Sequence, residues 1–193
     1  LIHADESCLG NQYRDKANPG GAGGLVEQFR PGEGWRRRDY WAHEPDTTNN
    51  RMALRSAILG LGSLRRPCDV VFSSDSQYLV KGMKEWIHRW IRRGWRRKGG
   101  PIENLELWKR LATVARRHRV QWRWVRGHAG HPKNEYAHHL ATRAAEERDS
   151  SPGLVPSGFE EWVHDRIDRG QFVDFLDLPP EDAFEPDEPP PEG

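Results

Sequence analysis

The segment DVVFSSD, residues 69–75, constrains the fold of this chain more than any other stretch. It is a short apolar run without polar alternation, which is the pattern of a strand buried on both faces. Residues 49–64 before it and 76–92 after it have the helical spacing of apolar side chains, and Pro67 ends the first of these runs. A buried strand between helices indicates an α/β fold in which helices cover a sheet.

Other segments of the sequence predict further strands of this sheet and further helices. Three extended segments joined by turns come first, at 1–7, 22–29 and 35–43, and a helix, a strand and a helix follow at 103–118, 119–125 and 133–148. We therefore expect one α/β domain over residues 1–148. Its mixed five-stranded sheet has three antiparallel strands followed by parallel strands and is flanked by helices.

The composition changes after residue 148. Residues 149–158 are linker-like, 159–178 have the spacing of an amphipathic helix, and the acidic, Pro-rich stretch 179–193 is predicted to be disordered. Residues 151–193 contain twelve acidic side chains and two arginines, a net charge of −10, so the first 150 residues carry +11 in a chain of total charge +1. A basic body suits a polyanionic partner, nucleic acid above all, although uneven charge on a soluble protein is the ordinary alternative.

Cysteine content and hydropathy exclude several classes of protein. Cys8 and Cys68 are the two cysteines, which is too few for a disulfide framework or a cysteine zinc site. No apolar run approaches the ~20 residues needed to span a bilayer, and no signal-peptide pattern opens the chain. We expect a monomer in the reducing cytoplasm, without membrane contact. Because the first residue is Leu in a strand already under way, we also expect that natural residues precede it.

Two aspartates stand at the ends of expected strands. Asp5 lies near the end of the first strand, and Asp75 closes the buried strand at 69–75. Ligands of α/β sheets commonly bind at such strand ends, so the two carboxylates could face a common divalent cation. Taken singly, each aspartate is as well explained by a helix cap or a turn.

Six sequence blocks, in this order, resemble type I ribonuclease H. They are ADESCLGN (4–11), TTNNRMALRSAI (47–58), SSDSQYLVKGM (73–83), WIHRWIRRGWRRKGG (86–100), NLELWKRL (104–111) and WVRGHAGHPKNEYAHHLA (124–141). The resemblance covers residues 1–148 and leaves out the C-terminal tail. It implies cleavage of the RNA strand of RNA–DNA hybrids by two Mg²⁺ or Mn²⁺ ions held by four carboxylates.

This sequence departs from the family at the implied metal site. Asp5 and Asp75 match two of the four ligands, but Ala53 replaces the Glu and His138 replaces the last Asp, so the formal charge of the set falls from −4 to −2. A His138 ligand favours Mn²⁺ over Mg²⁺. Glu135 shares a helical face with His138 and could compensate, as could Glu6, although strand alternation points Glu6 away from Asp5.

The resemblance also implies a role for a loop histidine. His128, in GHAGHP, matches the family histidine that assists proton transfer or product departure, and an ordinary imidazole pKa of ~6.5 suits either task.

A hybrid-binding surface is implied by further matches. The polar stretch before the first helix is explained by capping, by contact with the hybrid, or by both. The family's basic protrusion matches residues 86–98, where cations would grip phosphates beside aromatic rings. The expected contacts are Cys8, Asn11, Thr48, Asn49, Asn50 and Gln77, together with Trp86, Trp90, Arg92, Arg93, Trp95, Arg96, Arg97 and Lys98 of the protrusion.

Two functions remain open from the sequence. One is a hybrid-specific endoribonuclease with a rebuilt metal site at Asp5, Asp75 and His138, and the other is a catalytically silent module that binds RNA–DNA hybrids. A separate hypothesis is that the acidic tail docks on the chain's own basic protrusion and competes with the hybrid.

Overall fold

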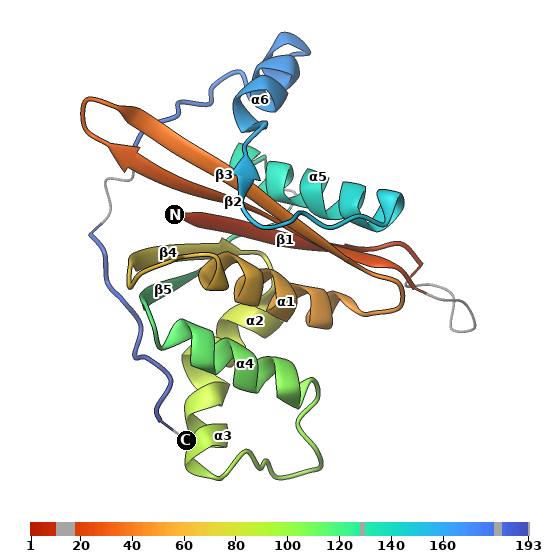
Figure 1. Cartoon of the computed structure of the whole chain (residues 1–193), viewed down its shortest axis with the longest axis vertical. Helices are drawn as coiled ribbons and strands as arrows, with labels where there is room; N and C mark the ends of the chain where they lie inside the picture. Colours follow the sequence, from red (N-terminus) through yellow and green to blue (C-terminus); the bar gives the residue numbers. More distant parts are fainter. Residues whose placement is uncertain (11–17, 128–129, 180–182, 193) are drawn as a thin grey trace.

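A six-stranded mixed sheet forms the centre of the molecule, with the strand order β5-β4-β1-β2-β3-β6 (Figure 1). The computed structural model describes residues 1–10, 18–127, 130–179 and 183–192. The strands are β1 (Ile2–Cys8), β2 (Gly20–Arg30), β3 (Gly34–Glu44), β4 (Asp69–Ser74), β5 (Arg119–Trp124) and β6 (Val155–Pro156). β1 to β3 pair antiparallel, whereas β4 pairs parallel with both β1 and β5. The expected α/β class and mixed sheet are confirmed.

The sixth strand was not expected from the sequence. β6 pairs with β3 through Val155 and Pro156, inside the stretch predicted to be a linker. Two residues are too short to produce an alternating pattern, and Pro156 argues against a strand except at a sheet edge, which is where β6 lies.

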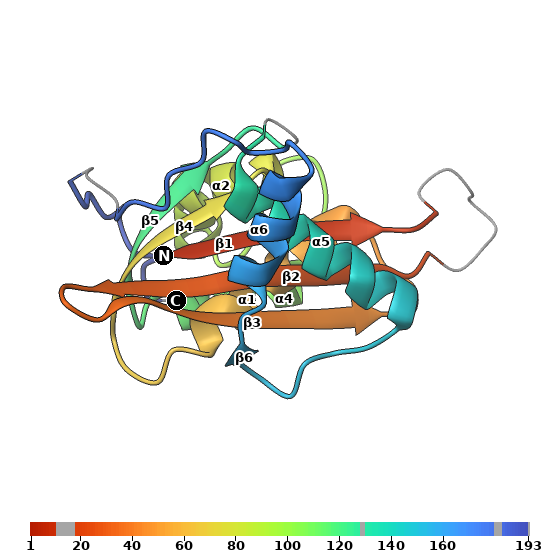
Figure 2. The same cartoon turned by 90° about the horizontal axis from the view of Figure 1, so that it is seen from above.

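Helices cover both faces of the sheet (Figures 1 and 2). On one face lie α5 (Pro132–Glu147) and α6 (Phe159–Asp168), and on the other lie α1 (Asn49–Gly62), α2 (Gln77–Lys81) and α4 (Leu105–Ala115), with α3 (Ile87–Arg92) beyond them. Among the described residues, none of the helices combines the length and apolarity required to cross a bilayer.

The helix expected at 76–92 is interrupted. A π-helical turn, Gly82–Trp86, joins α2 to α3. A Cβ at Gly82 would lie 2.0 Å from the Trp108 ring of α4, so the turn needs glycine at this close approach. The other two expected helices end early. The pattern at 103–118 forms a helix over Leu105–Ala115, and the pattern at 159–178 forms one over Phe159–Asp168, where Gly170 at φ +78° follows the end.

Two glycines of β2 bring α5 unusually close to the sheet. A Cβ at Gly21 would lie 1.9 Å from the Ala141 carbonyl oxygen, and one at Gly23 would lie 2.5 Å from the Ala141 nitrogen. Because Gly23 is paired with Asp5 on β1, this close packing brings the middle of α5 over Asp5.

Part of the C-terminal segment contacts the edge of the sheet. Residues 183–192 have no helix or strand, but Asp187 is bound to the edge strand β5: its backbone nitrogen donates to Val120 O at 2.9 Å, and its carboxylate accepts from Trp122 N at 2.7 Å. Composition does not reveal hydrogen bonds of this kind to a sheet edge. The expected disorder of residues 179–193 stays a prediction.

Candidate active site

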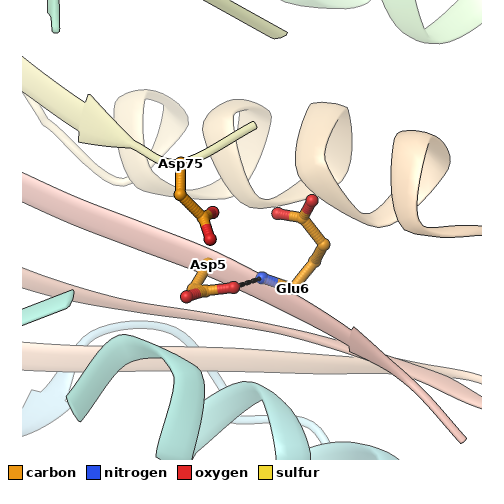
Figure 3. Close-up of side chains that lie close together, drawn as sticks. All are labelled: Asp5, Glu6 and Asp75. Carbon is orange, nitrogen blue, oxygen red and sulfur yellow. Dashed lines mark hydrogen bonds between the residues drawn. The ribbon is translucent and has the colours of Figure 1, made fainter. Parts of the chain in front are cut away.

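The candidate site lies where β4 ends and its parallel pairing with β1 stops. Ala4 of β1 pairs with Ser74, the last residue of β4, so Asp5 and Asp75 follow at neighbouring positions. Asp5 is buried and Asp75 is half-buried. With Glu6 they form a group of carboxylates in which one oxygen from each residue lies within 4.8 Å of the others (Figure 3). The sequence had placed Asp5 and Asp75 together, and the structure adds Glu6.

The expected orientation of Glu6 needs correction. Glu6 does leave β1 on the opposite face from Asp5: Ala4, two residues earlier, packs in the same core cluster as Ala53 and Ala57 of α1. The end of its side chain, however, turns so that the carboxylate lies near Asp75 (Figure 3). Glu6 thus brings a negative charge to the α1 side of the site, the side on which Ala53 lacks one.

Electrostatics of the three carboxylates favour a bound cation. Burial raises the pKa of Glu6 well above its ordinary value, and the nearby charges of Asp5 and Asp75 raise it further. The buried Glu6 Oε2 has no hydrogen-bond partner among the described residues. Carboxylate oxygens that repel one another, one of them a buried Glu6 oxygen without a donor, suit a divalent cation such as Mg²⁺.

Helix α5 holds Asp5 from the other side. Asn134 Nδ2 donates to Asp5 Oδ2 at 3.1 Å, and His138 Nδ1 lies 3.5 Å from Asp5 Oδ1. The hydrogen bond to Asp5 raises the pKa of His138, with partial burial opposing it. His138 Nε2 lies 3.3 Å from Thr142 Oγ1. His138 is therefore a partner of Asp5 that carries a positive charge when it is protonated.

Sequence reasoning missed Asn134 and considered Glu135 in its place. The spacing of four residues between Asn134 and His138, on one helical face, was a signal that could have found it. Glu135 and His138 lie outside the group formed by Asp5, Glu6 and Asp75.

The loop before α5 packs against Asp75. A Cβ at Gly127 would lie 2.3 Å from Asp75 Oδ2, so a larger residue there would displace the carboxylate. His128 follows Gly127 and lies outside the described residues. His131 stacks on His3 with ring centroids 5.5 Å apart, which gives it a packing role.

The side chains matched to the hybrid surface lie at the starts of α1 and α2 and at the end of β1. Thr48 is the N-cap of α1, and its hydroxyl accepts from Arg51 N at 3.3 Å, while Asn49 and Asn50 are exposed in the first turn. Thr48 thus caps the helix, while the neighbouring Asn49 and Asn50 present their side chains to solvent. Gln77 is exposed at the start of α2, Cys8 is half-buried at the end of β1, and Asn11 lies outside the described residues.

In the basic protrusion, residues 86–98, the cationic side chains and the aromatic rings lie in different environments. Its cationic side chains are exposed, whereas Trp86, Trp90 and Trp95 are half-buried against the core. Trp90 packs on Trp108 of α4 with centroids 5.5 Å apart, so the rings support the protrusion from beneath. The exposed cations are Arg89, Arg92, Arg93, Arg96, Arg97 and Lys98.

Comparison with known proteins agrees with this architecture. The family model for RNase H matches residues 1–146. Ribonuclease H of Shewanella halifaxensis (strain HAW-EB4) is 45% identical over 159 residues, covering 82% of this chain and 91% of the relative. Ribonuclease H of Geotalea uraniireducens (strain Rf4) is 46% identical over 146 residues, covering 75% and 92%.

Solved structures agree as well. The crystal structure of LC9-RNase H1, described as a type 1 RNase H with the type 2 active-site motif, superposes with a TM-score of 0.88 at 49% identity and covers 98% of this chain and 92% of that one. A foamy viral RNase H domain, at 18% identity and a TM-score of 0.65, covers 76% and 93% and shares the fold.

The chain therefore belongs to the ribonuclease H family. Within that family it is a type I-like ribonuclease H enzyme, as the six sequence blocks had implied.

Proposed function

We propose that this protein hydrolyses the RNA strand of RNA–DNA hybrids at a divalent-metal site formed by Asp5, Glu6 and Asp75. The observation that carries the proposal is the convergence of these three carboxylates within 4.8 Å. Glu6 supplies the charge that Ala53 no longer brings, so the site has three carboxylates where matching to the family pattern left two. Divalent cations held there would activate water and stabilise the leaving oxygen.

The chain's own residues prepare this site before any substrate arrives. Asn134 and His138 fix both oxygens of Asp5, and Gly127 allows the loop to pack against Asp75. His138 holds its proton to higher pH than an ordinary histidine. It therefore offsets part of the carboxylate charge and acts as a positioning residue. His128 remains the proposed proton carrier of the neighbouring loop.

The ligand atoms of the proposed site favour one metal ion over another. Three carboxylates supply oxygen ligands, which hard Mg²⁺ prefers. Both ring nitrogens of His138 lie close to protein oxygens, Asp5 Oδ1 and Thr142 Oγ1. We therefore propose that Mg²⁺ supports cleavage and that Mn²⁺ also serves, without the Mn²⁺ preference that a His138 ligand would give.

Substrate recognition divides between two surfaces. The exposed Asn49 and Asn50 amides suit 2′-hydroxyls in a wide, shallow minor groove, which distinguish RNA from DNA. The exposed cations of the protrusion suit phosphates of the DNA strand, so binding should weaken steeply with salt.

Cleavage of a labelled RNA–DNA hybrid with Mg²⁺, and separately with Mn²⁺, tests this function. The control is Asp75→Asn prepared identically. Cleavage by the parent and its loss in Asp75→Asn supports the proposal. Tight binding of the hybrid by the parent without cleavage in either metal would instead establish a silent hybrid-binding module.

A further inference from the structure

A second pocket lies beside the candidate active site, between α5 and α6. Its volume is about 510 Å³, and its lining includes His138, His139 and Thr142 of α5, Trp162 and Arg166 of α6, and Gln171 beyond α6. The family match ends at residue 146, so one wall of this pocket is built by a segment outside the family domain.

The pocket is continuous with the carboxylates through one side chain. His138 contacts Asp5 through Nδ1, at 3.5 Å, and Thr142 through Nε2, at 3.3 Å. His138 and Thr142 both line the pocket. His138 is therefore a side chain that the pocket shares with the carboxylate site.

Arg166 is held in the pocket without an acidic partner. The arginines around it are paired, Arg143 with Glu147 at 3.8 Å and Arg169 with Asp165 at 2.8 Å. Among the described residues, no carboxylate lies within ion-pair distance of Arg166. Its guanidinium lies 5.2 Å from the centre of the Trp162 ring and donates one long hydrogen bond, 3.4 Å, to Gln171 Oε1. The side chain is thus oriented without an ion pair, since Glu135, a carboxylate of the pocket lining, lies outside ion-pair distance of it.

Buried donors in the pocket wall also lack acceptors. Arg166 Nε and Trp162 Nε1 are buried and have no hydrogen-bond partner among the described residues. Buried unsatisfied donors are rare in native proteins and call for an explanation such as a bound ion. A phosphate brings several strong acceptor oxygens and a negative charge, which is what a guanidinium recognises well.

We infer that the α5–α6 pocket is an accessory phosphate subsite, in which Arg166 binds a phosphate of the hybrid next to the cleavage site. This rests on the proposed function, because the ligand is the same hybrid. With this subsite, the C-terminal segment would extend the stretch of hybrid that the family domain contacts.

Hybrid binding in the presence of a chelator, measured by fluorescence anisotropy over a series of salt concentrations, tests the inference. The variant is Arg166→Gln, and the matched control is Arg169→Gln, which makes the same charge change three residues away on an exposed arginine outside the pocket lining. We expect Arg166→Gln to weaken binding about tenfold and to reduce the slope of log affinity against log salt by roughly 0.7–0.9. Arg169→Gln should match the parent.

Arg166→Lys keeps the charge and guards against a folding defect. It should retain the salt slope of the parent while losing part of the affinity. A thermal-shift titration with inorganic phosphate distinguishes a free anion from the strand.

The outcomes separate cleanly. Equal binding by the parent, Arg166→Gln and Arg169→Gln overturns the subsite but leaves the proposed function intact. Equal weakening in both glutamine variants also overturns it, since the loss of binding would then come from the lower net charge and not from the pocket. Stabilisation of the parent by phosphate, with hybrid binding unchanged in Arg166→Gln, would mean that the pocket takes a free anion. Failure of the parent itself to bind the hybrid would remove the proposed function and the subsite together.

Discussion

Two groups of buried charges lie beside α5, and they are composed differently. In the first, here called the ionic cluster, Arg37 and Lys133 neutralise Glu27 and Asp177, and the exposed Glu160 adds a further contact to Arg37. Lys133 Nζ lies 2.5 Å from Glu27 Oε1 and 3.1 Å from Asp177 Oδ1, and Arg37 Nε lies 3.2 Å from Glu27 Oε2 and also pairs with Asp177. Buried carboxylates matched by cations are the usual way to place charge inside a protein.

The second group, the carboxylate site of Asp5, Glu6 and Asp75, has an excess of negative charge. Within the part of the chain that the structure describes, His138 contacts Asp5, and its side chain is 33% exposed and charged only when protonated. The same sheet thus carries one balanced and one unbalanced cluster. The balanced cluster ties the C-terminal segment to the sheet, whereas the unbalanced one needs a cation from outside, and this difference marks it as the functional site.

Removing the charge of Glu6 should give the largest effect on activity. Glu6→Gln is expected to lower metal-dependent cleavage of the hybrid by at least about 100-fold, because a ligand should matter more than the outer partners, whose loss costs about 10–100-fold. Glu27→Gln makes the same chemical change in the ionic cluster and should keep its activity per folded molecule. Similar losses in both variants would break the distinction between the clusters.

Glu27→Gln should instead show the largest loss of stability. It removes the fully buried one of the two carboxylates that Arg37 and Lys133 share and leaves them the partly exposed Asp177. Breaking a buried pair in this way costs about 3–5 kcal/mol. Urea denaturation in the presence of a chelator measures the free energy of unfolding. A loss below about 1 kcal/mol would mean that the ionic cluster is not the stabilising contact described.

Glu6→Gln should stabilise the protein when divalent metal is absent. The raised pKa of Glu6 means that the folded protein keeps this proton at pH values where the unfolded chain has lost it. Stability therefore falls as the pH rises above the ordinary value of 4.5 toward the folded pKa. At pH 7.5 with a chelator, Tm should rise by roughly 2–4 °C per kcal/mol gained. Mg²⁺ should then raise Tm in the parent alone, and an equal response in the variant would contradict a ligand role.

His3 should make the protein sensitive to mild acid. Burial lowers its pKa well below 6.5, and His131, Lys133, the N-terminus and Arg123 act in the same direction. Below pH 6.5 the unfolded chain takes up a proton that the folded chain refuses, so stability falls as the pH drops, by at most about 1.4 kcal/mol per pH unit. His3→Leu should flatten the dependence of Tm on pH between 6.5 and 5. A smaller dependence should remain from His131, whose pKa is also lowered. An unchanged slope would exclude His3 as its source.

The smallest effect is expected in the tail. Asp187 pairs with Lys84 at 3.1 Å as well as with β5. Asp187→Asn should cost about 0.5–1.5 kcal/mol, as is typical of one hydrogen-bonded group, and should leave hybrid affinity unchanged if the tail serves the sheet edge. Tighter hybrid binding at low salt would favour the hypothesis that the tail competes at the basic protrusion. This substitution is a cleaner test than deletion of residues 151–193, which would also remove Phe159 and Val163 from the second core cluster.

The sequence predicted the fold because its strongest patterns are local. The buried run at 69–75 and the spacing of apolar side chains at 49–64 each determine an element without reference to distant residues. Asp5 and Asp75 could be placed together because parallel strands end at one edge. The role of Glu6 could not be read from alternation, since its backbone stays in regular β1 while its long side chain reaches Asp75. The contacts of Asp177 and Asp187 depend on pairings far along the chain, which composition does not encode.

Moving the carboxylate back to its family position tests the central claim most directly. Glu6→Gly should abolish Mg²⁺-dependent cleavage of the hybrid, and adding Ala53→Glu in the same chain should restore a substantial part of it. This is because the charge returns to the α1 side of the site, where Ala53 now stands. Cleavage should be measured on both proteins beside the parent and Asp75→Asn. Full activity in Glu6→Gly alone would contradict the account, since Glu6 would then have no part in holding the metal.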